Sequence, residues 1–471
     1  MNEQENLQEY QLPDWINVTV SDKGKETRKI NEPRFCEVFR EEHDLARINE
    51  TFFLNGEKVT DATVKKMIQE KLEPYFTERT GRKTDDVFIT LSNFCFTEQP
   101  EPDEWKIYLK DDTTLILNRE GNIDEKTEKV FTLTRLPVQL VRKAECPTFR
   151  KYLSDLFYPE DIPAIQEFIG YCLVPSTRAQ AGMFIHGEGG EGKSVLRDVL
   201  MRLFGHAAIQ EGIHELGDAF TMINLENKLI CIDDDMRTEL LNETNTLKKL
   251  ITARERFQLE AKFKQKREGY IFARVIAIGN SHIGSKFDHS EGFYRRQLLI
   301  DCKPKTRAEK DDDRFMSDKC IEEISGILWW ALAGLIRLIR NNYNFTISKR
   351  MRDTLDGVKH EGNNVLTFAE DNATITFTNA FSDFVTSAEL FRAYAVWCMD
   401  NGETPIKRNS FARQFPKIYK LNITDKSCGK GLVPGGNSQV QGYTGMRFSA
   451  AMTDRLTGLD QKALDKFDRL P

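Results

Sequence analysis

Hydrophobic and polar positions at the start of the chain predict a small α/β region. Residues 1 to about 50 carry few apolar anchors and are expected to form a loosely ordered lead-in. Beyond residue 52 the apolar positions adopt helical or strand spacing. The predicted elements are a helix at 64–76 and strands at 86–91, 105–109 and 114–117. We therefore expect an N-terminal α/β domain over residues 1–145.

The middle of the chain alternates short apolar runs with helical spacing. Two amphipathic helices, at 149–156 and 162–171, open a second region that we place at 146–370. The elements that follow are strands at 183–186, 228–232, 273–278 and 297–302 and helices at 195–204 and 242–251. Strands that alternate with helices are typical of a parallel sheet covered by helices. A strongly apolar helix at 321–341 is interpreted as a buried lid or core helix.

The pattern changes again over residues 371–471. A helix at 387–400, a turn at 401–402, a basic helix at 409–419 and a strand at 442–448 follow one another. This succession predicts a winged-helix-like C-terminal domain.

Length and composition describe an ordinary soluble protein. The 471 residues are 40% hydrophobic and 30% charged, and at ~150 residues per domain they favour about three domains. The longest apolar run, 326–336, is shorter than the ~20 residues that span a bilayer, and the acidic N-terminus does not resemble a signal peptide. Nine scattered cysteines without a CxxC pair favour reduced thiols. We expect a cytoplasmic protein that does not bind a membrane.

Charge is divided unevenly along the chain. The net charge is −6, and residues 1–145 hold 22 basic and 30 acidic side chains, or −8, which leaves +2 for the rest. A nucleic-acid partner is therefore expected to bind the later two thirds of the chain.

A glycine-rich segment predicts a phosphate-binding loop. Residues 187–194 read Gly-Glu-Gly-Gly-Glu-Gly-Lys-Ser and lie between a predicted strand and a predicted helix. The backbone N–H groups of such a loop turn toward phosphates, while the lysine reaches the β and γ phosphates and the serine hydroxyl binds Mg²⁺. We expect ATP and Mg²⁺ to bind here. The binding residues are Gly187, Gly189, Gly190, Gly192, Lys193 and Ser194.

Polar residues end the next two predicted strands. Asp233 is assigned to Mg²⁺ and Asp234 to the base that activates water, because both follow a buried strand downstream of the phosphate loop. Asn280 follows the third strand and is a candidate to sense the γ phosphate or the attacking water. The alternatives are a solvated acidic loop for the aspartates and a simple turn for Asn280.

Basic residues near these strands suggest two further roles. Arg295, or else its neighbour Arg296, is a candidate arginine finger. Such an arginine reaches the nucleotide of a neighbouring subunit and stabilises the charge that develops at its γ phosphate. The segment 256–269 alternates apolar and polar residues and predicts a hairpin with a basic tip. A nucleic-acid strand is expected to contact Lys262, Phe263, Lys264 and Lys266. A surface salt bridge and a plain solvated hairpin are the respective alternatives.

The order of these motifs, GEGGEGKS, LICIDDD, EAKFKQKR, IAIGN and YRRQLLID, resembles that of the superfamily 3 helicases. The resemblance is to the phage/plasmid primase-helicase branch, as encoded by phage satellites and pathogenicity islands, and covers roughly residues 115–420. It implies an AAA+ P-loop core, 3′-to-5′ DNA unwinding by a homo-oligomeric ring, expected to be a hexamer, and single-stranded DNA in the ring channel. Members carry histidine where this chain has Phe263, a departure that leaves the role of Phe263 open. The first 145 residues are too short for the primase domain of larger relatives, so a separate primase or host replication proteins are expected partners.

The C-terminal region holds a second basic stretch. Between Pro405 and Lys430 there are seven lysines and arginines, among them Arg408 and Arg413, against Asp425 alone. This is a plausible footprint for duplex origin DNA, and a basic packing module is the alternative. The favoured function is a replicative DNA helicase of a mobile genetic element. The alternatives are a DNA-binding AAA+ initiator or remodelling ATPase that does not unwind, and a metabolic P-loop kinase.

Overall fold

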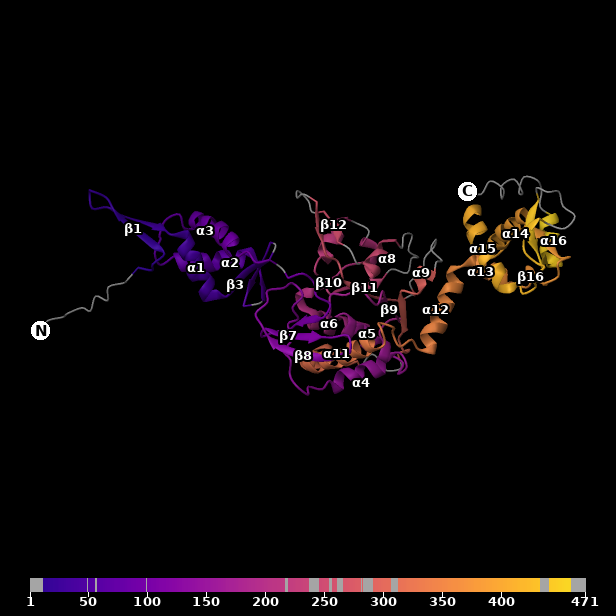
Figure 1. Cartoon of the computed structure of the whole chain (residues 1–471), viewed down its shortest axis with the longest axis horizontal. Helices are drawn as coiled ribbons and strands as arrows, with labels where there is room; N and C mark the ends of the chain where they lie inside the picture. The colour runs from indigo at the N-terminus through magenta and orange to yellow at the C-terminus, as the bar shows by residue number, and fades with distance from the viewer. Residues whose placement is uncertain are drawn as a thin grey trace. The chain divides into compact units, whose positions relative to one another are not determined.

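The chain forms two compact units in the computed structural model (Figure 1). The structure describes residues 12–48, 50–55, 57–98, 100–216, 219–236, 245–253, 256–260, 266–280, 282, 291–305, 312–432 and 440–458. The first unit contains the described residues up to 236, those from 245 to 280 and those from 300 to 348. The second contains residue 282, residues 291–299 and the described residues from 349 onward. Among these residues no helix combines the length and the apolar character needed to cross a bilayer.

The N-terminal elements of the first unit pack around their own aromatic core. They are β1 (Ile16–Val20), β2 (Glu26–Ile30), α1 (Glu32–His43), β3 (Leu45–Ile48), β4 (Thr51–Leu54), β5 (Glu57–Val59), α2 (Asp61–Leu72) and α3 (Thr80–Phe94). Trp15 meets the rings of Phe35 and Tyr75 edge to face, and Phe39 stacks on Phe35. For residues 12–48 the expectation of a loosely ordered lead-in was therefore wrong, because the aromatic side chains between residues 15 and 39 supply a core, whereas residues 1–11 lie outside the described residues.

Residues 86–91, predicted as a strand, lie within helix α3. The run of Val, Phe, Ile and Leu resembles a strand, but Thr84, Val87 and Leu91 are buried at helical spacing on one face of α3. The strands predicted next to it are confirmed as β6 (Lys106–Tyr108) and β7 (Thr113–Leu117), which continue into β8 (Ile123–Thr127) as an antiparallel sheet.

A five-stranded sheet forms the centre of the first unit. Its strands are β9 (Gly182–His186), β10 (Ala208–Gln210), β11 (Ile230–Met236), β14 (Arg274–Gly279) and β15 (Gln297–Asp301), of which β15 contributes only its last two residues to this unit. They follow the order β10-β11-β14-β9-β15, and the first four pair in parallel. The predicted alternation of strands and helices is confirmed, although the three-residue strand β10 was not predicted.

Helices precede, separate and follow the strands of this sheet along the chain. They include α4 (Pro147–Leu156), α5 (Ile162–Tyr171), α6 (Lys193–Phe204), α7 (Ala219–Met222), α8 (Asn245–Thr252), α10 (Met316–Glu322) and α11 (Ile324–Arg340). The predicted apolar helix at 321–341 is interrupted at Glu323, whose carboxylate accepts hydrogen bonds from the first turn of α4. Trp330 is buried and Trp329 donates its indole N–H to the carbonyl of Val141. The prediction of a buried core helix is confirmed.

The second unit packs helices against short antiparallel strands. Its elements are α9 (Glu291–Tyr294), α12 (Lys349–Gly362), α13 (Asn364–Glu370), β16 (Ile375–Phe377), β17 (Phe384–Thr386), α14 (Ser387–Asp400), α15 (Arg408–Asn422), β18 (Lys430–Leu432), β19 (Gln441–Thr444), β20 (Met446–Phe448) and α16 (Ala450–Thr457). Thr386 and Glu389 form a reciprocal capping box at the start of α14. The core combines aromatic residues of α13, α14, α15 and β19.

Candidate functional site

The glycine-rich loop lies between β9 and α6, as its sequence predicted. Strand β9 ends at His186 and α6 begins at Lys193. Gly189, Gly190 and Gly192 have φ angles of 122°, 78° and 110°, a region that side chains with a Cβ avoid. The loop therefore needs glycine at these three positions to turn sharply from the strand into the helix.

Lys193 points into this loop instead of away from it. Its ammonium donates to the carbonyl oxygen of Gly187 at 2.8 Å and to the carboxylate of Glu191 at 2.9 Å. The side chain of Lys193 is only 10% exposed. Tyr152 of α4 donates its hydroxyl to the carbonyl of Gly192 at 3.0 Å and so anchors the end of the loop. Ser194, the predicted Mg²⁺ ligand, is exposed at the start of α6.

Glu191 was not predicted to have a role, yet it occupies the inside of the loop. One carboxylate oxygen accepts the N–H of Gly189 at 2.7 Å while the other accepts the ammonium of Lys193. Burial by itself would raise the pKa of Glu191, but the hydrogen bonds from Lys193 and the loop backbone outweigh burial and lower it. The loop thus stabilises a negative charge at its centre.

The first predicted carboxylate, Asp233, is buried near the end of β11. It is 6% exposed, and its oxygens accept the backbone N–H of Ile213 at 2.8 Å and that of Asp235 at 3.3 Å. Burial raises the pKa of the Asp233 carboxyl, and these two hydrogen bonds partly oppose the shift. A bound cation would compensate the cost of keeping this group charged.

The second predicted carboxylate, Asp234, is held by two side chains. Arg197 of α6 forms an ion pair with one carboxylate oxygen, and Gln210 of β10 donates to the other at 2.6 Å. Arg197 also contacts Asp198 at 2.8 Å. The carboxylate therefore has a fixed orientation toward the helix that carries Lys193.

Neighbouring strands bring the loop, the aspartates and Asn280 to one edge of the sheet. Strand β14 lies between β11 and β9, and its last residue, Gly279, pairs with both Met236 and His186. The carbonyl of Gly279 accepts the N–H of Gly187, the first residue of the loop, at 3.1 Å. Asn280 follows directly and is exposed. Ligands bind at this edge of open parallel sheets, beyond the carboxyl ends of the strands.

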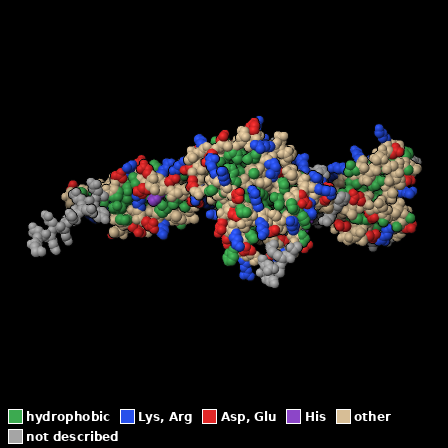
Figure 2. Space-filling view, turned by 90° about the horizontal axis from the view of Figure 1, so that it is seen from below, with side chains coloured by type: hydrophobic (Ala, Val, Ile, Leu, Met, Phe, Trp, Pro, Cys, Tyr) green, Lys and Arg blue, Asp and Glu red, His purple; other side chains and the backbone are tan. Residues whose placement is uncertain are grey.

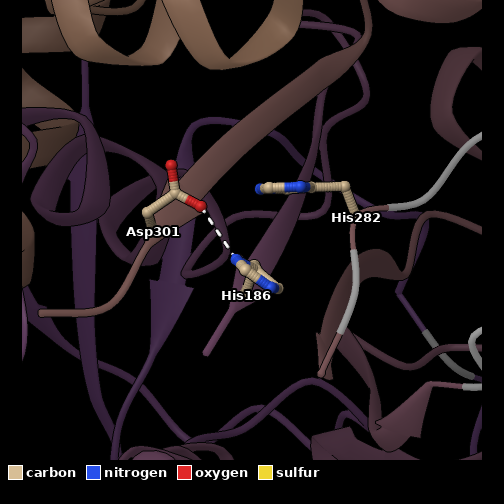
Figure 3. Close-up of side chains that lie close together, drawn as sticks. All are labelled: His186, His282 and Asp301. Atoms are coloured by element: carbon tan, nitrogen blue, oxygen red, sulfur yellow. Dashed lines mark hydrogen bonds and ion pairs between the residues drawn. The ribbon is translucent and has the colours of Figure 1, made fainter. Parts of the chain in front are cut away.

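The last two strands of the sheet are linked at the same edge. The Nδ1 atom of His186, at the end of β9, lies 3.0 Å from an oxygen of Asp301, at the end of β15, and the two side chains face one another (Figure 3). Because His186 directly precedes the glycine-rich loop, this contact fixes the point at which the loop leaves the sheet.

Sequence reasoning missed four residues around the loop: Glu191, Arg197, Gln210 and Lys305. Lys305 lies against Gly190, where a Cβ atom would be 3.5 Å from its ammonium, and pairs with Asp312 at 2.7 Å. Helical spacing could have indicated Arg197, since it lies one turn after Lys193 on α6. No sequence signal marked Lys305 or Gln210, because their approach to the loop depends on the tertiary fold.

The predicted hairpin is confirmed at its base. Strand β12 (Phe257–Leu259) pairs with β13 (Arg267–Gly269) in antiparallel fashion, and Arg267 forms an ion pair with Glu226. Lys266 is largely exposed and pairs with Glu260. The predicted tip residues Lys262, Phe263 and Lys264 lie outside the described residues.

The two candidate arginines differ in their surroundings. Arg296 donates to the carbonyl of Gly292, which anchors it to α9, whereas Arg295 is exposed in the turn between α9 and β15. Arg295 is therefore the more accessible of the two guanidinium groups.

The two C-terminal basic residues also differ. The guanidinium of Arg408 lies 5.7 Å from the ring centre of Phe391, so part of this side chain serves packing. Arg413 is exposed on α15 together with Lys417 and Lys420, and in the described part of the chain these three have no carboxylate partner. On the face drawn in Figure 2, basic and acidic side chains are interspersed over the molecule.

The chain is similar to one protein family and to several solved structures. A model described as a family of unknown function, DUF5906, matches residues 185–296. That segment contains the loop, both aspartates, Asn280 and the two arginines. No curated protein matches the chain.

Two of the similar structures are titled as forms of the NrS-1 C terminal region. "The A form apo structure of NrS-1 C terminal region-CTR" is 15% identical, with a TM-score of 0.49 and coverage of 87% of this chain and 97% of that one. "The apo structure of NrS-1 C terminal region (305-718)" is 13% identical, with a TM-score of 0.44 and coverage of 92% and 96%.

Proposed function

We propose that this chain is an ATP-hydrolysing 3′-to-5′ DNA helicase that acts as a replication initiator of a mobile genetic element. The observation that carries the proposal is the meeting of the glycine loop, Lys193, two aspartates and Asn280 at one edge of a parallel sheet. The polarity of unwinding and the type of element come from the resemblance to superfamily 3 helicases.

The residues at the edge fit a triphosphate and Mg²⁺. Backbone N–H groups of the loop and the ammonium of Lys193 would donate to phosphate oxygens. In support of this, the N–H of Gly189 and the ammonium of Lys193 already donate to an anionic group, the carboxylate of Glu191. Ser194 and Asp233 supply the hydroxyl and carboxylate oxygens that would hold Mg²⁺. When bound, Mg²⁺ would neutralise charge on the phosphates.

The other residues at this edge would position the attacking water and contact the γ phosphate. Asp234, oriented by Arg197 and Gln210, would accept a hydrogen bond and then a proton from the attacking water. The amide of Asn280 would donate to the γ phosphate or to that water. Arg295 would reach the nucleotide of the next subunit in a homo-oligomeric ring, expected to be a hexamer.

An AAA+ core and a winged-helix-like C-terminal domain are part of the same proposal. The loop strand β9 lies between β14 and β15 in the sheet, so residues at the ends of both neighbours would adjoin the phosphates of a bound nucleotide. The second unit has paired helices α14 and α15 and the three-stranded antiparallel sheet β17-β19-β18, which suits a winged helix. A cytoplasmic location, with a separate primase or host replication proteins as partners, follows from the function.

Strand displacement tests the helicase proposal. With ATP and Mg²⁺, the wild-type chain should separate a duplex that has a 3′ single-stranded tail, while Lys193→Ala should not. Lys264→Ala should retain ATP hydrolysis but lose displacement, because the hairpin lysine would grip the strand. Hydrolysis of ATP by the wild type without displacement on any tailed substrate would reject the helicase activity.

A DNA-binding ATPase that does not unwind is the second candidate. The exposed cations Arg413, Lys417 and Lys420 on α15 favour contact with duplex phosphates. The DNA association constant falls as the salt concentration rises. Replacing all three residues with alanine should make the slope of log association constant against log salt concentration less steep by about 3, at ~0.9 for each lost phosphate contact. The matched control replaces Lys65, Lys66 and Lys71 on α2, each already paired with a carboxylate, and should leave the slope unchanged.

A further inference from the structure

The phosphate loop contains a negatively charged side chain of its own. Both carboxylate oxygens of Glu191 are bound: one to the N–H of Gly189 at 2.7 Å and the other to the ammonium of Lys193 at 2.9 Å. Glu191 is 6% exposed, whereas Glu188, three residues earlier in the same loop, is exposed. One of two nearby glutamates is therefore directed into the loop and the other away from it.

Glu191 uses the groups that phosphate oxygens would need. Lys193 and the loop N–H of Gly189 are the donors that such a loop offers to a nucleotide. The loop leaves little spare room beside the pair, since a Cβ atom on Gly187 would lie 2.8 Å from the ammonium of Lys193 and 2.9 Å from the carboxylate of Glu191. Two anions in this space would repel one another, so the carboxylate and a phosphate group exclude each other.

We propose that Glu191 is an intramolecular competitor that sets the nucleotide affinity of the loop. The proposal rests on the nucleotide site proposed above and adds a residue that controls it. Without nucleotide, Glu191 gives the ammonium of Lys193 a charged acceptor beside the carbonyl of Gly187, and it accepts the N–H of Gly189. Nucleotide binds only when the carboxylate leaves, so the apparent affinity is the intrinsic affinity multiplied by the fraction of molecules with an open loop.

The competition predicts tighter binding when the carboxylate is removed. If Glu191 fills the loop in about nine molecules of ten, Glu191→Ala should lower the Kd for MgATP about tenfold. Glu191→Gln, which keeps the size but loses the charge, should lower it by a smaller factor. Glu188→Ala removes the same charge from the exposed position and should change the Kd by less than about twofold.

Calorimetric titration of the full chain with MgATP tests the proposal, with Lys193→Ala as the variant that should not bind. Thermal unfolding of each variant without nucleotide checks that it is folded. Glu191→Ala should unfold at a lower temperature than wild type, because Lys193 keeps the carbonyl of Gly187 but loses its carboxylate partner. Saturating MgATP should remove that difference.

The outcomes separate this proposal from the nucleotide site itself. Equal or weaker binding by both folded Glu191 variants, with wild-type binding that depends on Lys193, would overturn the competitor role and leave the site intact. An equal decrease of the Kd for MgATP in Glu188→Ala would also overturn it, because loss of any negative charge near the loop would then explain the tighter binding. Absence of MgATP binding by wild type and by Glu191→Ala would reject the nucleotide site and the competitor together.

Discussion

Arg197 connects the helix that carries Lys193 to the carboxylate proposed to activate water. It lies on α6, one turn beyond Lys193, and pairs with Asp234 of β11. A carboxylate that accepts a proton from water must be held within hydrogen-bond reach of that water. At the scale of single residues, the geometry of the proposed reaction therefore depends on a residue that itself need not touch the nucleotide.

Replacing Arg197 with alanine should slow ATP hydrolysis strongly. Because Asp234 would lose one of its two restraints, we expect kcat to fall by about 10²-fold while KM changes little. Arg202→Ala, at an exposed arginine further along α6, is the matched control and should retain wild-type kcat. Steady-state hydrolysis measures both, and an unchanged kcat in Arg197→Ala would remove the positioning role.

His206 makes the stability of the first unit dependent on pH. Burial, together with the nearby ammonium of Lys228, lowers the pKa of His206 from 6.5 to about 4. In the unfolded chain the histidine gains a proton as the pH falls below about 6.5, whereas the folded chain keeps it neutral down to about 4. Stability should thus be lost between these values, on the order of 2 kcal/mol.

Thermal unfolding at pH 7.5 and at pH 5 checks this prediction. His206→Gln should unfold with a smaller drop in Tm between the two pH values than wild type, because it has no group that gains a proton. His214→Gln, at an exposed histidine, should show the wild-type drop. If Tm falls as much in His206→Gln as in wild type between pH 7.5 and pH 5, the pH dependence comes from other groups.

At the scale of elements, the packing of α5 against α11 supports the sheet that carries the site. Both helices contribute a glycine to the contact. A Cβ atom on Gly334 would overlap the carbonyl of Gln166, and one on Gly170 would overlap the carbonyl of Ala331. The two backbones approach so closely that only glycine fits at these positions.

Gly334→Ala should therefore destabilise the first unit. We expect a loss of about 1–3 kcal/mol, the usual cost of overpacking, measured as the free energy of unfolding in urea. Gly357→Ala on α12, where the added Cβ atom meets nothing within 4 Å, is the control. It should be neutral or stabilising by up to about 1 kcal/mol, because alanine is the better helix former. Equal stability of Gly334→Ala and wild type would refute the close packing.

Sequence predicted the elements with long or regular patterns and failed for those set by tertiary contacts. Strands β9, β11, β14 and β15 and helices α4, α5 and α6 were predicted because each has a continuous apolar run or a clear helical face. Helix α3 was mistaken for a strand at 86–91, and the strand β10 has only three residues. The loop, Asp233, Asp234 and Asn280 were recognisable from local motifs, but the inward turn of Glu191 depends on its bonds to Gly189 and Lys193.

At the scale of the whole molecule, the proposed ring requires a residue that acts between subunits. Arg295 is exposed, while Arg296 donates to the carbonyl of Gly292 in α9. Arg295→Ala should bind MgATP normally and lose hydrolysis, since the guanidinium stabilises charge only in the transition state. Mixing Arg295→Ala with Lys193→Ala protein should restore part of the activity, because some interfaces would then combine an intact loop with an intact arginine. Failure to restore hydrolysis at any mixing ratio would assign the role to another residue or to action within one subunit.

The most direct test of the account is the rate of ATP hydrolysis by the purified chain, with and without single-stranded DNA. We expect turnover by the wild type that single-stranded DNA increases. We expect a loss of at least about 10²-fold in Lys193→Ala, because the ammonium of Lys193 would supply positive charge at the phosphates. Hydrolysis by Lys193→Ala at the wild-type rate, or none by the folded wild type under either condition, would contradict the claim that the edge of this sheet is an ATPase site.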